Sequence, residues 1–162
     1  LTETIYAKEL AEYYKIPTRV SRVFIPYGIF DEPQKVMPSV VKSLTRKEPV
    51  DLTQAEQIRD FIYIDDIAQA YALIMENIDS NMLFDIYNVS SGQACSLKDM
   101  LLEIANILDC DQSLLHFGKR DMNTNEPNVA IGDNQKLLNL GWKPLNFSQG
   151  LQRYISKWRE LP

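Results

Sequence analysis

Short β-prone runs alternate with helical patterns along the whole chain, and this alternation limits the fold more than any other feature. Strands are expected at residues 18–24, 60–64, 84–89, 114–117 and 129–131, and helices at residues 2–15, 36–46, 66–77, from Ser96 onward and 147–160. Interleaved strands and helices are typical of the α/β class. A chain of 162 residues can bury a proper core, and its length alone predicts one domain.

Charge and composition exclude several classes of protein. The net charge of −5 argues against nucleic acid as a partner, because proteins that bind phosphate backbones usually carry a basic face. No apolar run is long enough to cross a membrane. The polar opening from Leu1 to Thr4 continues into a helical pattern and does not resemble a secretion signal, so we expect a cytoplasmic protein.

The two cysteines, Cys95 and Cys110, are not spaced like metal ligands. We therefore predict two free thiols in a reducing compartment and no metal site. A disulfide between these two cysteines is the alternative.

Residues 57–71, QIRDFIYIDDIAQAY, place an arginine before a strand and two acids after it. Asp65 or Asp66 stands where the N-cap of the next helix should lie. A carboxylate at an N-cap accepts backbone N–H bonds and complements the helix dipole, which contributes about 1 kcal/mol. We therefore predict that this aspartate pair caps the helix and has no catalytic role.

Arg59 stands at the junction of a loop and a strand. A guanidinium in such a place can bind a phosphate or carboxylate through two parallel hydrogen bonds. Its spacing is equally compatible with a solvated surface arginine, so the pattern alone leaves both interpretations open.

Five segments, in this order and spacing, resemble the C-terminal half of one enzyme family. They are RVFIPYG at 22–28, KVMP at 35–38, QIRDFIYIDDIAQA at 57–70, YNVSSGQACSL at 87–97 and GDNQKLLNLGWKPLNFSQGL at 132–151. The family is the extended short-chain dehydrogenases/reductases, in the group of nucleotide-sugar epimerases and dehydratases. The resemblance covers essentially the whole chain. It implies the last strands of a Rossmann-type parallel sheet plus a smaller, mixed α/β substrate-binding domain.

Two motifs of that family are absent from these 162 residues. The family binds the pyrophosphate of NAD at a strand–GxxGxxG–helix unit, and the six glycines here do not have that spacing. The family also uses a Tyr-x-x-x-Lys pair, and none of the eight tyrosines here is followed by lysine four residues later. The opening stretch resembles the region just after that pair. We therefore expect the catalytic pair and the cofactor-binding part to lie upstream of Leu1, and these residues alone to be inactive.

The resemblance also implies roles for five residues. Arg59 matches an arginine that contacts the diphosphate of the nucleotide sugar, and Glu126 matches an acid that accepts hydrogen bonds from the ribose hydroxyls. Lys35 would lie along the nucleotide, near the base. Tyr27 and Gly28 would lie where the nicotinamide end of the cofactor meets the sugar. The alternatives are a plain loop acid for Glu126 and a solvated residue at a helix start for Lys35.

Several positions depart from the family pattern. Ile25 stands where relatives often carry asparagine, Asn123 where many carry arginine, and Ser90 where glycine is usual. Because the first two positions contact the substrate in relatives, we expect either an uncommon substrate or weak binding of the diphosphate.

The resulting functional prediction concerns the enzyme to which this half belongs. Such an enzyme would use NAD to oxidise C4 of a nucleotide-linked sugar, epimerise or dehydrate the 4-keto sugar, and return the hydride. This chain would bind the nucleotide diphosphate sugar, and the enzyme would be a homodimer. The alternatives are a reductase or decarboxylase on the same scaffold, and a noncatalytic binding module that retains the fold.

Overall fold

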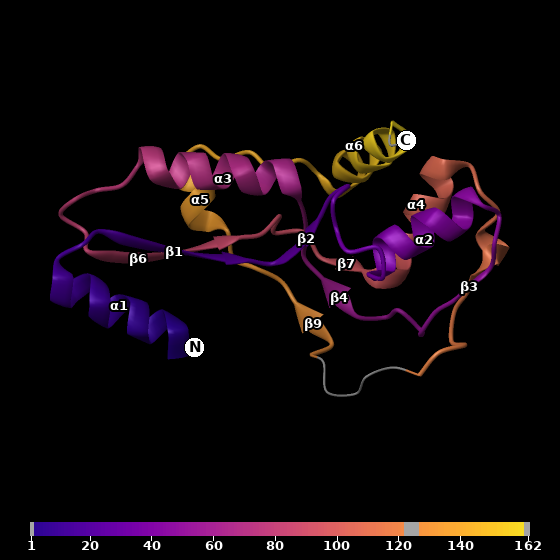
Figure 1. The fold of residues 1–162 in the computed structure, drawn as a ribbon, viewed down its shortest axis with the longest axis horizontal. Helices are drawn as coiled ribbons and strands as arrows, with labels where there is room; N and C mark the ends of the chain where they lie inside the picture. Colours follow the sequence, from indigo (N-terminus) through magenta and orange to yellow (C-terminus); the bar gives the residue numbers. More distant parts are fainter. Residues whose placement is uncertain (1, 122–126, 161–162) are drawn as a thin grey trace.

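A computed structural model describes residues 2–121 and 127–160 of the chain. The elements in chain order are α1 (Thr2–Tyr14), β1 (Thr18–Val23), β2 (Ile25–Tyr27), α2 (Val36–Thr45), β3 (Val50–Asp51), β4 (Ile58–Arg59), β5 (Phe61–Tyr63), α3 (Ile64–Glu76), β6 (Phe84–Val89), β7 (Cys95–Ser96), α4 (Leu97–Leu108), the 3-10 helix η1 (Gln112–Leu114), β8 (Leu115–His116), β9 (Val129–Ala130), α5 (Gln135–Asn139) and α6 (Phe147–Arg159). Figure 1 shows two regions, one around β1 and β6 and one around α2, α4 and α6.

The first region is built on the parallel pair β1–β6. The two strands run in register from Thr18 opposite Phe84 to Val23 opposite Val89. Helix α1 covers one face of this pair, while α3 and α5 cover the other (Figure 1). A core lies on the α3 side, and its buried residues are Ile62, Ile67, Ala70, Ile74, Tyr87, Val89, Leu137 and Trp142. The predicted parallel pairing of strands from a Rossmann-type sheet is confirmed.

Strand β1 is less buried than its sequence predicts. We expected a buried strand at residues 18–24, but no residue of β1 is fully buried and Val23 is 36% exposed. The physical reason is that, in the described part of the chain, β1 pairs with β6 alone and so has one covered edge.

The second region is a mixed α/β unit. Its strands form short pairs: β2 with β5 and β3 with β8, both parallel, and β4 between antiparallel β7 and parallel β9. Helices α2, α4 and α6 pack together with β5 around a larger core that includes Val40, Leu44, Met100, Ile104 and Tyr154. This arrangement agrees with the smaller, mixed α/β unit that the resemblance implies.

Side chains cap helices α4 and α6. The Ser96 side chain accepts a hydrogen bond from the Asp99 backbone, and Asn146 and Gln149 form a reciprocal capping box at α6. The predicted cap at Asp65 or Asp66 is wrong. Helix α3 begins directly after β5, so Tyr63 occupies the N-cap position and both aspartates lie inside the first turn.

Both aspartates instead attach α3 to the C-terminal segment. The buried carboxylate of Asp66 accepts a hydrogen bond from the Leu145 backbone at 3.1 Å, and Trp142 Nε1 donates to the Asp66 carbonyl at 3.2 Å. Asp65 pairs with Lys157 of α6 at 2.9 Å. These contacts join residues that are 76 to 92 positions apart along the chain.

Asp66 should make the stability of the fold depend on pH. Burial, its largest perturbation, raises the pKa of Asp66 above the ordinary value of 3.8. The folded protein thus holds this proton more tightly than the unfolded chain, and the free energy of unfolding falls as pH rises from about 4 through the folded pKa. Asp66→Asn should reduce that fall, because asparagine keeps an acceptor for Leu145 and carries no charge. Urea unfolding at several pH values measures the effect.

Asp66→Ala is the matched comparison. It leaves the Leu145 N–H without its acceptor and should cost about 1–3 kcal/mol at neutral pH. Equal pH dependence in the wild type and Asp66→Asn would contradict the assignment of this titration to Asp66.

Candidate functional site

The carboxyl ends of β1 and β6 meet at the dipeptide Arg59–Asp60. Directly after β1, Phe24 N donates to Val89 O at 3.1 Å and Ile25 N donates to Asp60 O at 3.1 Å. The turn after β6 is bound to the carboxylate of Asp60 through Ser91 and Gly92. Open α/β sheets bind their ligands at the carboxyl ends of the parallel strands. We therefore take this end of the β1–β6 pair as the candidate site.

Arg59 is held rigidly at this position. It lies on β4, opposite Cys95 of β7 and Ala130 of β9, and it is only 8% exposed. Its Nη1 donates to the carbonyls of Ile58 at 3.0 Å and Asn128 at 3.3 Å. The alternative of a solvated surface arginine is therefore wrong. A guanidinium fixed in this way suits the bidentate binding of an oxyanion.

Asp60 is the central polar residue of the site, and our sequence reasoning missed it. It is fully buried, and its carboxylate accepts hydrogen bonds from Ser91 N and Ser91 Oγ, both at 2.7 Å. It also accepts from Gly92 N at 2.9 Å and Gly132 N at 3.2 Å. One signal was available: aspartate is unfavourable in strands, yet it stands between two β-prone segments, which indicates a specific role.

Exposed apolar side chains surround this polar centre. Val23 ends β1, Ile25 donates to Asp60, Val129 pairs with Ile58, and Ile131 precedes Gly132. All four are at least 36% exposed. Small-molecule sites commonly combine an apolar lining with a few precisely placed polar groups.

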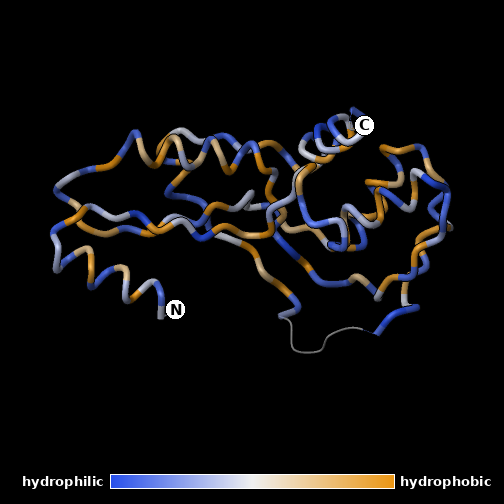
Figure 2. Tube along the Cα trace, viewed as in Figure 1, coloured by the Kyte–Doolittle hydropathy of each residue, from blue (hydrophilic) through white to orange (hydrophobic). Residues whose placement is uncertain are grey.

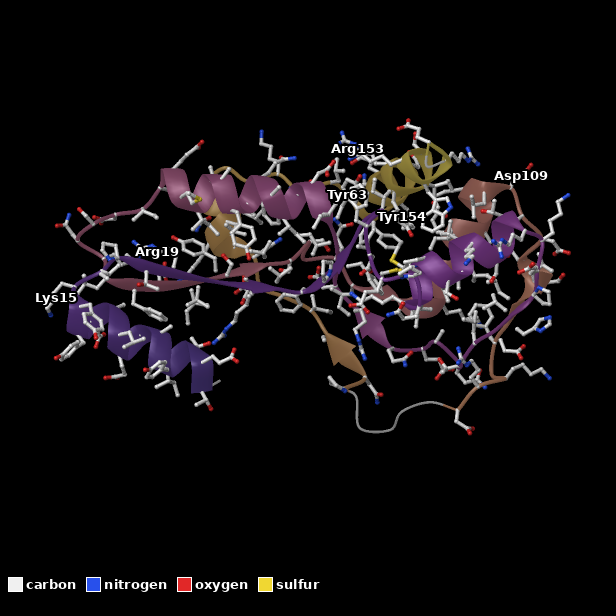
Figure 3. All side chains as sticks on the ribbon, viewed as in Figure 1. Lys15, Arg19, Tyr63, Asp109, Arg153 and Tyr154 are labelled. Carbon is white, nitrogen blue, oxygen red and sulfur yellow. The ribbon has the colours of Figure 1, made fainter. Side chains whose placement is uncertain are left out.

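Tyr27 lies in the core and is not part of this polar centre. The strand predicted at 18–24 ends at Val23, and Tyr27 closes the separate short strand β2. Its ring packs against Tyr63 and Tyr154, with centroids 5.6 Å and 6.0 Å away; Figure 3 shows those two residues where α3 and α6 come close together. Burial raises the pKa of Tyr27 far above its ordinary value. Strand β2 starts beside Asp60, and Tyr27 is its third residue, so Tyr27 is about 7 Å from that end.

Gly28 and Lys35 accompany Tyr27 at the far end of β2. Gly28 lines a pocket of about 190 Å³ with Tyr27, Ile29, Phe30, Asp31 and Ile64. A Cβ on Gly28 would lie 2.7 Å from Ile64 Cγ2, so the Ile64 side chain packs closely against the backbone here. Lys35 forms an ion pair with Asp31 at 2.7 Å just before α2, and the hydrogen bond to Asp31 raises the pKa of Lys35. The predicted site residues therefore lie in two places. Arg59 lies at the start of the β2–β5 pair, and Tyr27, Gly28 and Lys35 lie at its far end.

The packing of Tyr27 against α6 gives a testable prediction. A Cβ on Gly150 would lie 2.1 Å from the Tyr27 hydroxyl oxygen. Gly150→Ala should therefore destabilise the fold by about 1–3 kcal/mol, although alanine favours a helix interior over glycine by about 1 kcal/mol. Chemical denaturation of Gly150→Ala with and without Tyr27→Phe measures this, and the loss should largely disappear when the hydroxyl is removed. A loss of equal size in both backgrounds would show that the hydroxyl is not the obstacle.

Some expectations concern residues that the structure does not describe. Glu126, proposed from the resemblance, and Asn123 lie outside the described residues. Within residues 2–121 and 127–160, no group of three histidine, cysteine, aspartate or glutamate side chains could hold a metal ion. Cys95 and Cys110 are free thiols, as predicted. None of the helices that the structure describes is long and apolar enough to cross a membrane.

Two other cations, Lys15 and Arg19, lie at the opposite end of the sheet. Figure 3 shows both near the amino end of β1. Arg19 donates to the carbonyls of Met82 at 2.8 Å and Asp79 at 2.9 Å, so it fixes the turn before β6. Its hydrogen bonding resembles that of Arg59, but it lies at the amino ends of the strands, away from the candidate site.

Known proteins resemble this chain over almost its whole length. CDP-abequose synthase of Salmonella typhimurium is 31% identical over 156 residues, covering 92% of this chain and 52% of the relative. The dTDP-4-dehydro-6-deoxyglucose reductase of Escherichia coli is 27% identical over 164 residues, covering 98% of this chain and 50% of the reductase. The chain thus spans about half the length of these curated relatives.

A solved structure with the same fold is UDP-glucose 4-epimerase of Thermotoga maritima with UDP-glucose. It superimposes with a TM-score of 0.84 at 22% identity, covering 98% of this chain and 51% of the epimerase. The model of the NAD dependent epimerase/dehydratase family matches residues 2–90, which is more than half of the chain. The chain therefore belongs to the NAD dependent epimerase/dehydratase family.

Proposed function

We propose that this chain is the C-terminal, nucleotide-sugar-binding portion of an NAD-dependent nucleotide-sugar epimerase or 4,6-dehydratase. The observation that supports it best is that the carboxyl ends of β1 and β6 are both hydrogen-bonded to Asp60, the residue next to the buried, backbone-anchored Arg59. Family membership makes a nucleotide diphosphate sugar the natural ligand for a cation at that place. We place the enzyme in the cytoplasm, with Arg59 on the diphosphate and Glu126 on the ribose.

The division of the other predicted residues refines this proposal. Lys35, Tyr27 and Gly28 gather at the far end of β2, with the Lys35 cation already paired with Asp31. We therefore propose that the diphosphate lies at the Arg59 end. Lys35 and the pocket beside it would stabilise the loop that leads into α2.

The residues of this chain do not fit the whole cofactor. NAD, when bound, would accept and return the hydride at C4 of the sugar. These 162 residues contain neither a GxxGxxG segment nor a Tyr-x-x-x-Lys pair, so we assign no step of the hydride chemistry to them. We propose that the residues of this chain bind the nucleotide, fix the orientation of the diphosphate through Arg59, and cover the diphosphate with apolar side chains.

A reductase on the same scaffold is the second candidate. One observation favours it: a relative of 27% identity is named as a dTDP-4-dehydro-6-deoxyglucose reductase. A decarboxylase and a noncatalytic binding module remain further alternatives. Any coding sequence upstream of Leu1 would discriminate between enzyme and binding module, since a GxxGxxG unit and a Tyr-x-x-x-Lys pair there would support the enzyme.

Binding of nucleoside diphosphates tests the proposal. Calorimetric titration of the protein with CDP, dTDP and UDP should show saturable binding of at least one of them. The corresponding nucleosides are the matched controls, and they should bind much more weakly because they lack the diphosphate. If no nucleoside diphosphate binds, or if nucleosides bind equally well, the proposed role of this chain is wrong.

We further propose that the protein is a homodimer in which α1 takes part. Tyr6, Leu10 and Tyr13 are exposed on α1 at the spacing of one helix face. Apolar positions recur along this outer helix in Figure 2. Exposed apolar faces of this kind commonly mark interaction surfaces.

Light scattering across a concentration series should therefore show association. The double substitution Tyr6→Lys and Tyr13→Lys should shift the protein towards monomer, because it places charge on the contact. Met75→Lys on α3, which also replaces an exposed apolar side chain, is the control and should leave the association unchanged. A wild type that remains monomeric at high concentration would contradict the dimer proposal.

A further inference from the structure

We propose that Asp60 is a positioning residue for the diphosphate site, acting through Arg59. Its buried carboxylate holds β4, the turn after β6 and the segment that follows β9 in one fixed arrangement. This inference rests on the proposed function, because it concerns the same site.

The first observation is the completeness of the carboxylate's hydrogen bonding. Asp60 Oδ1 accepts from Ser91 N and Ser91 Oγ at 2.7 Å each, and Oδ2 accepts from Gly92 N at 2.9 Å and Gly132 N at 3.2 Å. Every one of these partners is a donor, so the surroundings match the acceptor-only character of an ionised carboxylate. The donors are 31 to 72 residues away along the chain, so a single side chain joins three distant segments.

The second observation is that glycine stands at two of these donor positions for geometric reasons. Gly92 has a positive φ of 73°, and a Cβ there would lie 3.0 Å from Asn134 Nδ2. A Cβ on Gly132 would lie 2.3 Å from Ser90 Oγ. Both backbones therefore approach the carboxylate along paths that a side chain would obstruct.

The third observation connects the hydrogen bonds around the Asp60 carboxylate to Arg59. The segment from Asn128 to Gly132 is hydrogen-bonded to three consecutive residues, Ile58, Arg59 and Asp60. At one end, Asn128 O accepts hydrogen bonds from Ile58 N at 2.9 Å and from Arg59 Nη1 at 3.3 Å. At the other end, Gly132 N donates to Asp60. A shift of Asp60 therefore moves β9, and with it the carbonyl that fixes the guanidinium of Arg59.

The two residues of the dipeptide Arg59–Asp60 would therefore have different roles. Arg59 would contact the ligand, whereas Asp60 is fully buried and all its partners are internal. Asp60 would thus determine how accurately the Arg59 guanidinium is positioned relative to the diphosphate. A site residue must be held within about 0.5 Å of its productive geometry to be effective, so loss of this support should weaken binding with Arg59 still present.

Asp60→Asn is the direct test, because it preserves the shape of the side chain. One oxygen is replaced by an NH2 group, which must then face two of the donors. The protein would be titrated with whichever of CDP, dTDP and UDP binds most tightly. We expect Asp60→Asn to weaken this binding about tenfold. Asp85→Asn, the same chemical change at a carboxylate near the amino end of β6 that pairs with Lys136, should leave it unchanged.

A double-mutant cycle separates positioning from a general loss of stability. If Asp60 acts through Arg59, Asp60→Asn should change the affinity less than twofold in an Arg59→Ala background. If Asp60→Asn does not fold, Ser91→Ala removes only one of the four donors. It should weaken binding two- to threefold with Arg59 present and not at all with Arg59 absent.

The outcomes are distinct. Affinity losses of equal size with and without Arg59, or an unchanged affinity in Asp60→Asn, overturn the positioning role and leave the proposed function standing. A wild type that binds no nucleoside diphosphate, or an Arg59→Ala variant that binds as tightly as the wild type, contradicts the proposed function itself and this inference with it.

Discussion

Replacing Arg59 by alanine is expected to weaken the binding of a nucleoside diphosphate tenfold or more. A charge-assisted, bidentate contact contributes about 1.5–3 kcal/mol, and about 1.4 kcal/mol corresponds to a factor of ten in the dissociation constant. Arg59 is anchored by the carbonyls of Ile58 and Asn128, so its guanidinium is ordered before the ligand arrives. Calorimetric titration of the wild type and the variant measures the difference.

Arg19→Ala is a well-matched control for this experiment. Arg19 also donates to two backbone carbonyls, those of Met82 and Asp79, but it lies at the amino end of β1. Its removal should disturb local structure to a similar degree and leave the affinity unchanged. Arg59→Lys separates charge from shape, because lysine keeps the cation but cannot form two parallel bonds. Unchanged affinity in Arg59→Ala would remove the residue from the ligand site.

The largest expected effect concerns catalysis by the 162 residues themselves. We expect hydride exchange with NAD to be at background when the purified chain is mixed with a panel of nucleotide sugars. The reason is chemical, because the chain lacks the Tyr-x-x-x-Lys pair and the glycine-rich turn with which the family binds NAD. Chromatographic separation of the nucleotide sugars measures their turnover, because the hydride is returned to the sugar and reduced nicotinamide does not accumulate. Turnover that survives repurification of the chain would show that other residues perform this chemistry.

Local sequence patterns were sufficient to predict the elements whose structure depends on residues close together in the chain. The predicted helices end within two residues of the observed ones, because their periodic apolar residues and caps lie within the helices themselves. Ser96 and Asn146 cap their helices through residues only three positions away. The parallel pairing of β1 with β6 depended on the family resemblance, because strand periodicity alone does not specify a partner.

The sequence-based predictions of residue roles failed where a side chain binds a partner from a distant part of the chain. Asp65 and Asp66 have the residue type of a helix cap, but their partners are Lys157 and Leu145, which local reasoning cannot identify. Asp60 escaped attention because its donors, Ser91, Gly92 and Gly132, are brought to it only by the fold.

The role that the resemblance implies for Tyr27, beside the cofactor and the sugar, stays a prediction. It rests on the position of Tyr27 in the RVFIPYG segment. The structure buries its ring between Tyr63 and Tyr154, because β2 is a separate strand that leads away from the carboxyl end of β1.

The most direct test of the account is a crystal structure of the protein with CDP, dTDP or UDP bound. The account predicts that the diphosphate lies at the carboxyl ends of β1 and β6, with its oxygens within hydrogen-bonding distance of the Arg59 guanidinium. A diphosphate found instead beside Lys35, in the pocket at the far end of β2, or beside Arg19, at the amino end of β1, would contradict it.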